Sequence, residues 1–513
     1  MPWRAAATVV AAALVAWVAG GVVTRRVQAA RIPPPPELSA TAAPIREALL
    51  AADSAARSAP SAASIGGLAR AYHANLRATE ALQLYAVAER LAPADWIWTY
   101  DRALLLEERG DQAATRAALE RVVAQAPQVG LAWYRLAELA FKQRRLDDAS
   151  AAYQHARDAP GQPPFTPPGV TSRQLVPLGA YAGLGLGRVA LERGDAAGAV
   201  QQLTRVVESY PAFGPARSLL RTIERGVTPA ASGQRGFAAP FVPPADPVLD
   251  AIVAESRHSD MLLKHAGLAT RAGDDAFREY LVRRALRYNP TDLNVLMEMA
   301  AMLQATGRLT EALEVLKQHE ALAPGEHHTL VEEGRTLTDL GRFAEAEAVL
   351  RRAVVVRDAA AEYNLGTVLD HEQRWDEARQ HYERALVIDP FHTRAMNNLG
   401  VGLDRRGEGR AALAMFERAL AIEPNTAEYY VNYGSALIQQ GRFDAAVTAL
   451  QEAVGLEPRS SNAHNNLGIA LARLGQLPRA RDEFVAAVRL DPTHENARRN
   501  LEHLSGMVPP RPR

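Results

Sequence analysis

Apolar and small residues recur along the chain with a period of 34 positions. Between residues 259 and 494 most periods carry a large apolar residue, a Leu-Gly or Tyr-Gly pair, a turn glycine, alanine, an aromatic residue, alanine and proline. One complete unit reads Met396, Leu399, Gly400, Leu403, Gly407, Ala412, Phe416, Ala419 and Pro424. A fixed period of this length is typical of a solenoid built from helix-turn-helix units. We therefore predict an all-α solenoid.

The residue types in this unit explain why two helices would pack closely. Gly400 and its equivalents lack a side chain, so the first helix can approach the second. Ala412 and Ala419 keep the second helix small where a larger residue would push the pair apart. We expect Gly407 to adopt the left-handed conformation of the turn between the helices, and Pro424 to end the unit.

The period divides the chain into blocks separated by proline-rich segments. In chain order the predicted segments are a transmembrane anchor or signal segment (1–30), a proline- and alanine-rich linker (31–61), an N-terminal block of about four repeats (62–225) with a proline-rich insert (160–177), a second linker (226–247), a C-terminal block of seven repeats with a closing helix (248–505) and a tail (506–513). We expect Pro33 to Pro36 to form a stiff polyproline spacer. Asp358 stands where neighbouring units have proline, which predicts a local kink.

The N-terminal segment has the length of a membrane span. Ala5 to Val23 contains 19 uncharged residues, and a helix of that length reaches about 28 Å, close to the ~30 Å hydrocarbon core. Residues 18–20 also resemble a signal-peptidase cleavage site, so a cleaved signal followed by export is the alternative. Arg25 and Arg26 favour a retained single-pass anchor. The charges on the two sides of the segment are nearly balanced, and for a bacterial anchor followed by a long domain we expect the repeats in the periplasm.

Composition narrows the function further. The formal net charge is zero, which argues against a nucleic-acid partner. Cysteine is absent, which excludes disulfides, thiolate nucleophiles, Cys-ligated zinc and covalently attached haem. Basic residues are almost all arginine and alanine is abundant; this composition is typical of a GC-rich bacterial genome.

The pattern of large residue, Leu-Gly, turn Gly, Ala, aromatic, Ala and Pro resembles the tetratricopeptide repeat (TPR) family. The resemblance covers residues 259–494 strongly and 62–213 weakly. It implies a right-handed superhelix whose first helices line a concave groove, and a partner that is a protein or peptide. The O-linked N-acetylglucosaminyl transferases have a similar asparagine-rich array followed by a large catalytic domain, whereas only 19 residues follow residue 494 here. We therefore expect neither an enzyme nor a cofactor.

One residue type repeats on the face that the resemblance makes concave. Its members are Asn364, Asn398, Asn432 and Asn466, with Asn397 and Asn465 beside two of them and Arg394, Arg405 and Arg473 nearby. An asparagine amide both donates and accepts hydrogen bonds, so such a ladder can hold a peptide main chain without reading its side chains. The alternative is that the asparagines only connect the repeats.

No other motif predicts chemistry. Gly183, Gly185 and Gly187 imitate a dinucleotide loop, but Arg188 follows and no strand precedes them. His327 and His328 lack a third ligand at metal-binding spacing. The predicted function is a protein-interaction scaffold at the bacterial inner membrane. The alternative is an accessory subunit of an envelope enzyme or assembly complex for polysaccharide, secretion or cytochrome maturation, which would contact it through the convex face and the loops.

Overall fold

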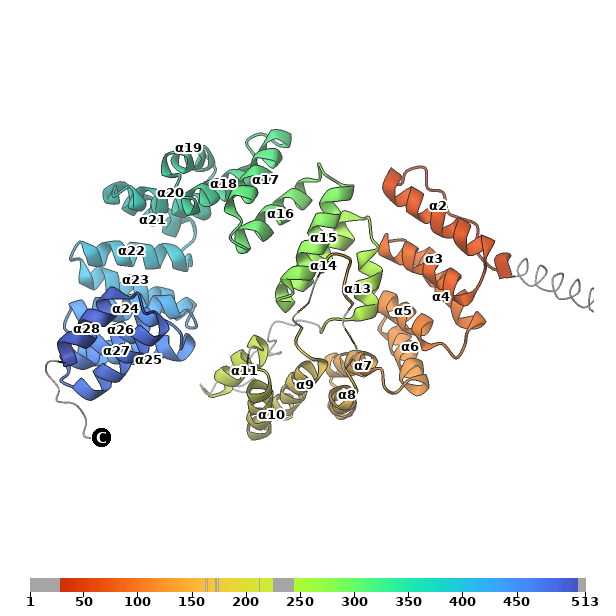
Figure 1. The fold of residues 1–513 in the computed structure, drawn as a ribbon, viewed down its shortest axis with the longest axis horizontal. Helices are drawn as coiled ribbons and strands as arrows, with labels where there is room; N and C mark the ends of the chain where they lie inside the picture. Colours follow the sequence, from red (N-terminus) through yellow and green to blue (C-terminus); the bar gives the residue numbers. More distant parts are fainter. Residues whose placement is uncertain are drawn as a thin grey trace, which may run out of the picture. The chain divides into compact units, whose positions relative to one another are not determined.

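The computed structural model describes residues 28–505, except residues 162, 164, 171, 172, 174, 212 and 225–243. Every regular element in these ranges is a helix, as predicted (Figure 1). The predicted span from Ala5 to Val23, the tail 506–513 and most of the second linker lie outside the described residues. Among the helices that are described, none is both long and apolar enough to cross a bilayer.

The chain forms two compact units, Met1–Met299 (unit 1) and Ala300–Arg513 (unit 2). Unit 1 contains α2 (Ala43–Ser58), the pairs α3 (Ala62–Ala74) with α4 (Ala78–Leu91), α5 (Trp96–Glu108) with α6 (Gln112–Gln125), α7 (Gly130–Lys142) with α8 (Leu146–Asp158), and α9 (Leu178–Glu192) with α10 (Ala196–Ser209), and then α11 (Gly214–Glu224), α13 (Pro247–Ala254), and the pair α14 (Ser259–Ala272) with α15 (Asp275–Tyr288). Helix α16 (Leu293–Ala305) contains the boundary between the units.

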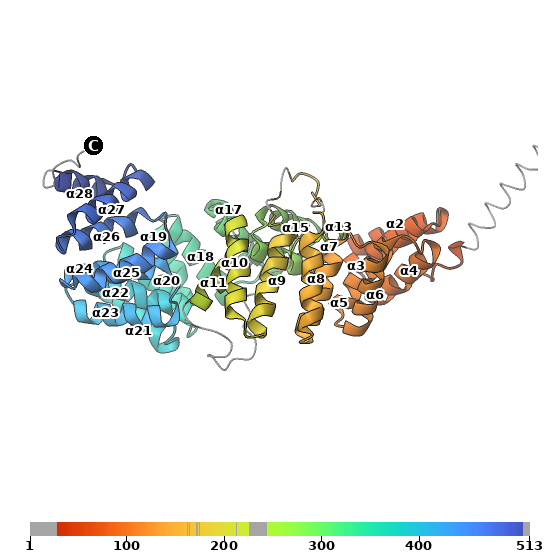
Figure 2. The same ribbon diagram turned by 90° about the horizontal axis from the view of Figure 1, so that it is seen from below.

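Unit 2 continues the same arrangement with strictly alternating helices. After α17 (Leu309–Leu322) it contains α18 (His327–Asp339) with α19 (Phe343–Ala353), α20 (Ala359–His371) with α21 (Trp375–Ile388), α22 (Thr393–Arg405) with α23 (Gly409–Ile422), α24 (Ala427–Gln439) with α25 (Phe443–Leu456), α26 (Ser461–Arg473) with α27 (Leu477–Leu490), and the closing helix α28 (Glu495–Ser505). We call the first helix of each pair the A helix and the second the B helix. Figure 2 shows successive pairs of unit 2 stacked side by side.

The glycine and alanine positions have the structural roles that the sequence predicts. A Cβ atom on Gly400 would lie 2.8 Å from the Phe416 ring, so the A helix touches the aromatic residue of its B helix directly. Ala412 and Ala419 are fully buried. Gly407 adopts φ +78°, which confirms the left-handed turn. The equivalent turn residue also has positive φ at Gly273, Gly307, Gly341, Gly441 and Gly475.

The irregular unit before Asp358 differs from its neighbours by a shorter B helix. Helix α19 has 11 residues, whereas α21, like the other B helices of unit 2, has 14. The chain leaves the helix at Val354 and exposes Val355, which is 85% accessible. Asp358 then accepts a hydrogen bond from the Ala360 N–H and caps α20. The irregularity that the missing proline predicts is therefore an early helix end followed by an aspartate cap.

The proline run is not a free spacer, contrary to the prediction. Ile32 before it and Leu38 after it are both buried, in one core cluster with α2 and α3. The Arg57 guanidinium on α2 donates to the carbonyl oxygens of Ile32 (3.5 Å) and Pro33. The run therefore lies against α2 as part of unit 1.

Segments that follow the second linker belong to unit 1 in the structure. Helix α13 packs on α3 and α5. Arg257 extends this contact, because its backbone N–H donates to Asn75 Oδ1 at 3.2 Å and its side chain donates to the Pro44 carbonyl at 2.6 Å. The compact unit thus continues past the predicted linker at 226–247 and ends at Met299.

Candidate functional site

The A helices of unit 2 form the inner side of its stack. Each of α18, α20, α22, α24 and α26 contacts the next A helix, and α26 contacts α28. Neighbouring B helices have no comparable contact and pack on A helices instead. In a curved stack the inner row has the shorter radius, so its members lie closer together. We call the exposed side of these A helices the A-helix surface.

The predicted asparagines lie on these helices and bridge neighbouring repeats. Asn432 Nδ2 donates to Asn397 Oδ1 at 2.9 Å, and Asn500 Nδ2 donates to Asn465 Oδ1 at 3.0 Å. Asn398 Nδ2 reaches Tyr363 Oη at 3.4 Å. Each bond joins residues 35 positions apart. The asparagines therefore do connect repeats, as one of the two sequence interpretations holds.

Not every predicted asparagine is used in this way. Asn364 is only 8% accessible and has no hydrogen-bond partner among the described residues. Asn466 accepts a hydrogen bond from its neighbour Asn465 at 3.1 Å. It makes no bond to α24, because the residue 35 positions before it, where the other bonds find their acceptor, is Val431. The ladder is thus continuous over part of unit 2 only, and amide groups remain available beside it.

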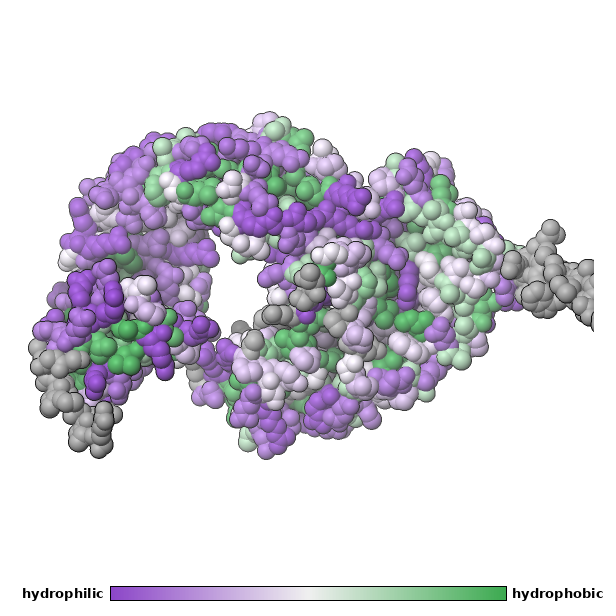
Figure 3. Space-filling view, viewed as in Figure 1, coloured by the Kyte–Doolittle hydropathy of each residue, from purple (hydrophilic) through white to green (hydrophobic). Residues whose placement is uncertain are grey.

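The three predicted arginines are exposed on the same helices. Arg405 lies 3.9 Å from Asp370, and its side chain is 69% accessible. Arg394 and Arg473 form no ion pair with any described residue. Hydrophilic residues predominate on the face of unit 2 visible in Figure 3. The structure therefore places the predicted residues on the same A helices, with the arginines exposed and Asn364, Asn397 and Asn465 buried. Their contact with a peptide stays a prediction.

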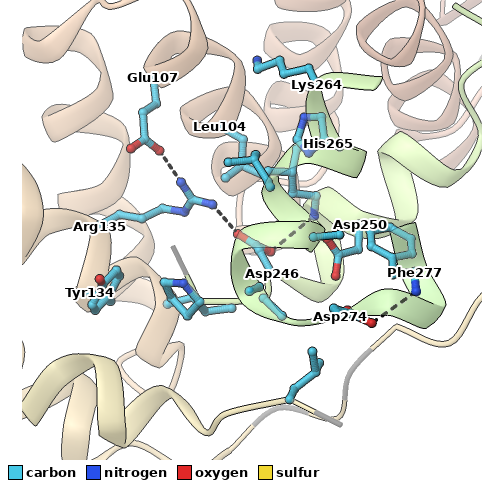
Figure 4. Close-up of a pocket in the computed structure, with 18 of the residues that line it drawn as sticks. Leu104, Glu107, Tyr134, Arg135, Asp246, Asp250, Lys264, His265, Asp274 and Phe277 are labelled. Carbon is cyan, nitrogen blue, oxygen red and sulfur yellow. Dashed lines mark hydrogen bonds and ion pairs between the residues drawn. The ribbon is translucent and has the colours of Figure 1, made fainter. Parts of the chain in front are cut away.

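A cavity in unit 1 was not predicted from the sequence. Its volume is about 260 Å³, and its walls come from α5, α7, the proline-rich insert, the segment 244–250, α14 and α15 (Figure 4). The apolar part of the lining is Leu104, Leu131, Leu175, Leu249, Leu268, Ala269, Ala272 and Phe277. The charged part is Glu107, Glu108, Arg135, Glu138, Lys142, Arg173, Asp246, Asp250, Lys264 and Asp274, and His265 also lines it.

Arg135 of α7 holds the segment before α13 in the cavity wall. Its guanidinium contacts Asp246 at 2.8 Å and also pairs with Glu107 (Figure 4). The Tyr100 hydroxyl donates to the same Asp246 oxygen at 2.6 Å. The other Asp246 oxygen accepts the backbone N–H groups of Val248 and Leu249 and so caps α13. Both oxygens of this buried carboxylate are thereby satisfied.

Arg173 fixes the proline-rich insert to the same region. Its side chain is 2% accessible and contacts Asp250 at 2.9 Å and Asp274 at 2.5 Å. The guanidinium also lies over the Phe277 ring, 4.2 Å from its centroid, where a cation is attracted to the π face. Burial raises the pKa of Asp250 to about 7, although Arg173 acts in the opposite direction. The insert is therefore a wall of the cavity.

The remaining side of the cavity carries a carboxylate between basic groups. Glu108 lies 3.5 Å from His73 Nε2, 3.8 Å from His265 Nε2 and 3.6 Å from Lys264 Nζ. Burial acts against ionisation of Glu108, but the two nearby histidines and the Lys264 charge hold its pKa well below the usual range. Burial lowers the pKa of His265. We infer an ionised Glu108 beside a neutral His265.

The sequence carries little trace of this cavity. Arg173 and Asp274 are 101 positions apart, and Arg135 and Asp246 are 111 apart. Arg173 lies in the insert and Asp246 at the end of the second linker, two segments that interrupt the repeat, so no periodic pattern connects these pairs. The only local signal is Asp246 and Asp250, four positions apart at the start of a predicted helix.

Comparison with known proteins identifies the repeats. A family model described as tetratricopeptide repeat matches residues 100–163, 331–393, 397–456 and 434–495. A second model with the same description matches residues 181–212. Together the two models cover half of the chain. Among proteins with curated descriptions, none matches this sequence.

Several solved structures are similar in fold. The Cut9–Hcn1 hetero-tetramer of APC/C is 13% identical, with a TM-score of 0.44 over 84% of this chain and 93% of that chain. A tetratricopeptide repeat protein from Parabacteroides merdae is 17% identical, with a TM-score of 0.38 over 48% of this chain and 98% of its own. YrrB, described as a TPR protein with an unusual peptide-binding site, is 19% identical, with a TM-score of 0.27 over 43% of this chain and 97% of its own.

Proposed function

Because the chain belongs to the tetratricopeptide repeat family, we propose that it is a non-catalytic scaffold that binds an extended protein segment on the A-helix surface of unit 2. The observation that carries the proposal is the row of amide and guanidinium groups on successive A helices. Proteins with these repeats bind protein or peptide partners, and such a row offers hydrogen bonds to a main chain.

The spacing of the A helices suits an extended segment. Packed helices lie about 8–10 Å apart, and an extended chain advances about 3.3 Å per residue. A bound segment would therefore meet a new A helix about every third residue. Asn364 supports this mode, since its amide has no hydrogen-bond partner among the described residues and can pair with a bound main chain.

The charge on this surface favours an acidic segment. Arg394 and Arg473 are exposed, and no described acidic residue neutralises either of them. Arg405 shares its charge only loosely with Asp370, at 3.9 Å. A partner with carboxylates near these positions would gain up to about 1 kcal/mol for each exposed pair, less at high salt.

The test is a binding screen with the purified full-length protein in detergent. Fluorescence anisotropy would compare extended acidic, neutral and basic peptides of about twelve residues. We expect acidic peptides to bind, and the double variant Arg394→Ala/Arg473→Ala to weaken them several-fold. The matched control is Arg410→Ala/Arg489→Ala, which removes two exposed arginines from B helices. Equal loss in both variants, or no preference for acidic peptides, would contradict the proposal.

We further propose that the protein is tethered in a bacterial inner membrane through Ala5–Val23, with its repeats in the periplasm. The length of the apolar segment and Arg25 and Arg26 after it support the retained anchor. Ile32 docks on unit 1 only nine residues after Val23, so unit 1 would lie within about 30 Å of the bilayer. Alkaline extraction of membranes with mass spectrometry of the mature N-terminus tests the anchor against the exported, signal-cleaved alternative.

The second candidate, an accessory subunit that contacts an envelope enzyme through its B-helix side, is favoured by exposed apolar residues. Val355, Val387 and Phe391 are 85%, 69% and 71% accessible, and all three lie at or just after the ends of B helices. Exposed apolar side chains of this size are typical of interaction surfaces when they gather in a patch. Loss of a membrane partner in a Val387→Asp/Phe391→Asp variant that still binds acidic peptides would support this candidate over the first.

A further inference from the structure

The unit 1 cavity has the features of a built ligand site. Its volume of about 260 Å³ is slightly below the roughly 300–1,000 Å³ of typical small-molecule pockets, which suits a small ligand. Its lining combines a continuous apolar part with charged groups that are held in place by salt bridges. Because Arg135 and Arg173 join the insert and the 244–250 segment to the repeats, the walls are assembled before any ligand arrives. The cavity lies wholly within unit 1, so it is independent of the A-helix surface.

The charges in the wall favour a positively charged ligand. Six acidic residues line the cavity against four basic ones. Both arginines are committed, since Arg135 pairs with Glu107 and Asp246, and Arg173 pairs with Asp250 and Asp274. The two arginines therefore have no unpaired charge to offer an anionic ligand, and the excess of carboxylates in the lining disfavours it.

Unsatisfied buried acceptors point to a ligand that donates hydrogen bonds. Glu138 is 4% accessible; its Oε1 accepts from Tyr153 at 2.5 Å and Arg188 at 2.9 Å, but its Oε2 has no partner. Asp250 Oδ2 lies beside Arg173 but likewise accepts no hydrogen bond. Leaving such groups unpaired is costly, so an incoming N–H donor would be favoured.

The side chains that line the cavity do not suit a simple metal ion. Within the described residues no three His, Asp or Glu side chains are grouped so that they could hold a metal. Leucines on α5, α7, α13 and α14 and the ring of Phe277 instead offer contact to methylene groups. The cavity thus combines an acidic wall with an apolar one.

We propose that this cavity binds a small organic cation, an alkylammonium or alkylguanidinium group, with its charged end at the acidic wall and its methylene chain against the leucines. The cation is either a free amine or the side chain of a lysine or arginine in a partner protein, and both present the same chemistry to the wall. Figure 4 shows His265 and Lys264 on one side of the cavity and Arg135 on the other.

Isothermal titration calorimetry on the full-length protein in detergent tests the proposal. The probes are n-butylguanidinium and n-butylammonium, with pentanoate as the anionic control of similar length. We expect saturable one-to-one binding of the cations with a Kd of about millimolar or tighter, and no binding of pentanoate. Absence of cation binding, or equal binding of pentanoate, would overturn the proposal.

Two variants locate the site. Glu138→Gln keeps an acceptor for Tyr153 and Arg188 but removes the charge, and should weaken cation binding about tenfold or more. Ala272→Leu fills the cavity and should block binding without changing any charge. The control Glu192→Gln alters a carboxylate that pairs with Arg144 outside the cavity lining and should bind as the wild type does. Thermal melts confirm folding, and unchanged binding in both folded cavity variants would refute the location.

A second arm identifies the source of the cation. Blocked pentapeptides with one central lysine or arginine flanked by alanines would be titrated beside the free amines. Tighter binding of a peptide indicates a partner side chain, whereas binding of free amines alone indicates a small molecule. If neither binds, the cavity proposal fails, while the acidic-peptide test of unit 2 stands unaffected.

Discussion

Single residues in this chain have roles that depend on their partners. Asn397 is 3% accessible and bonds both Asn432 and Glu428, whereas Asn364, which is 8% accessible on the neighbouring A helix, has no described partner. The same amide therefore connects helices in one repeat and is left for solvent or ligand in another. This difference is measurable, because only the first asparagine has native hydrogen bonds to lose.

Asn397→Ala should destabilise unit 2 by roughly 1–3 kcal/mol, since it leaves the Asn432 amide without its acceptor. Asn364→Ala, the matched control, should change the free energy of unfolding by less than about 0.5 kcal/mol. Chemical denaturation followed by circular dichroism measures both. Equal destabilisation by the two changes would show that Asn364 is also a structural residue.

The raised pKa of the buried Glu333 carboxyl on α18 should make the stability of unit 2 depend on pH. Burial, together with the hydrogen bond and negative charge of Glu320, raises its pKa from 4.5 to about 7. The folded state therefore holds the proton more tightly than the unfolded state does. The resulting stabilisation is complete below about pH 4.5 and is lost as the pH rises through 7.

Glu333→Gln removes this titration, so the variant should melt roughly 2–4 °C above the wild type at pH 8. The gap should close at pH 4.5, where the wild-type carboxyl is protonated. Calorimetric scans of both proteins at the two pH values give the comparison. A gap that is the same at both pH values would mean that the gain comes from packing and not from the proton.

At the scale of the element, the pairing of A and B helices depends on a glycine beneath an aromatic ring. This contact recurs at Gly366 with Tyr382 and at Gly468 with Phe484, at 2.8 and 2.6 Å from the position of a Cβ atom. In α18 and α24 a leucine takes the place of the ring, over Gly334 and Gly434. The close packing of each helix pair therefore requires a residue without a side chain at the glycine position of the A helix.

Gly400→Ala should cost roughly 1–3 kcal/mol, because the added methyl would collide with the Phe416 ring. Gly455→Ala in α25 meets no atom within 4 Å and should stabilise by up to roughly 0.5–1 kcal/mol through helix propensity. Urea denaturation of the two variants beside the wild type tests both signs at once. A stabilising Gly400→Ala would show that the pair can separate without loss.

At the scale of the whole molecule, the two compact units predict that a destabilising change in one unit leaves the other unit protected. Repeat arrays gain stability from neighbouring contacts only, so a defect weakens its surroundings more than distant repeats. Tyr382 is fully buried in unit 2, and its ring packs against Gly366. Tyr382→Ala should therefore cost about 3–5 kcal/mol locally. Hydrogen exchange should accelerate in helices α20 to α23, while α3 to α9 stay as protected as in the wild type. Faster exchange throughout unit 1 would instead show that the molecule unfolds as one.

The helix pairs were predictable from sequence and the cavity was not, for one physical reason. Gly400 and Phe416 lie in the same repeat, so the period itself predicts that they meet. Arg173 meets Asp274 across 101 positions, and Arg173 lies in an insert that breaks the period. The docking of Ile32 was missed because a proline run predicts stiffness but not what it lies against.

The hydrogen bond from Asn500 to Asn465 has a consequence for how such a protein changes over time. Helix α28 presents to α26 the same amide contact that α24 presents to α22. A duplicated segment of 34 residues inserted at this end would find a surface that already matches it. Lengthening by unequal recombination therefore needs no new interface, and the reach of the scaffold can be altered without redesigning its ends.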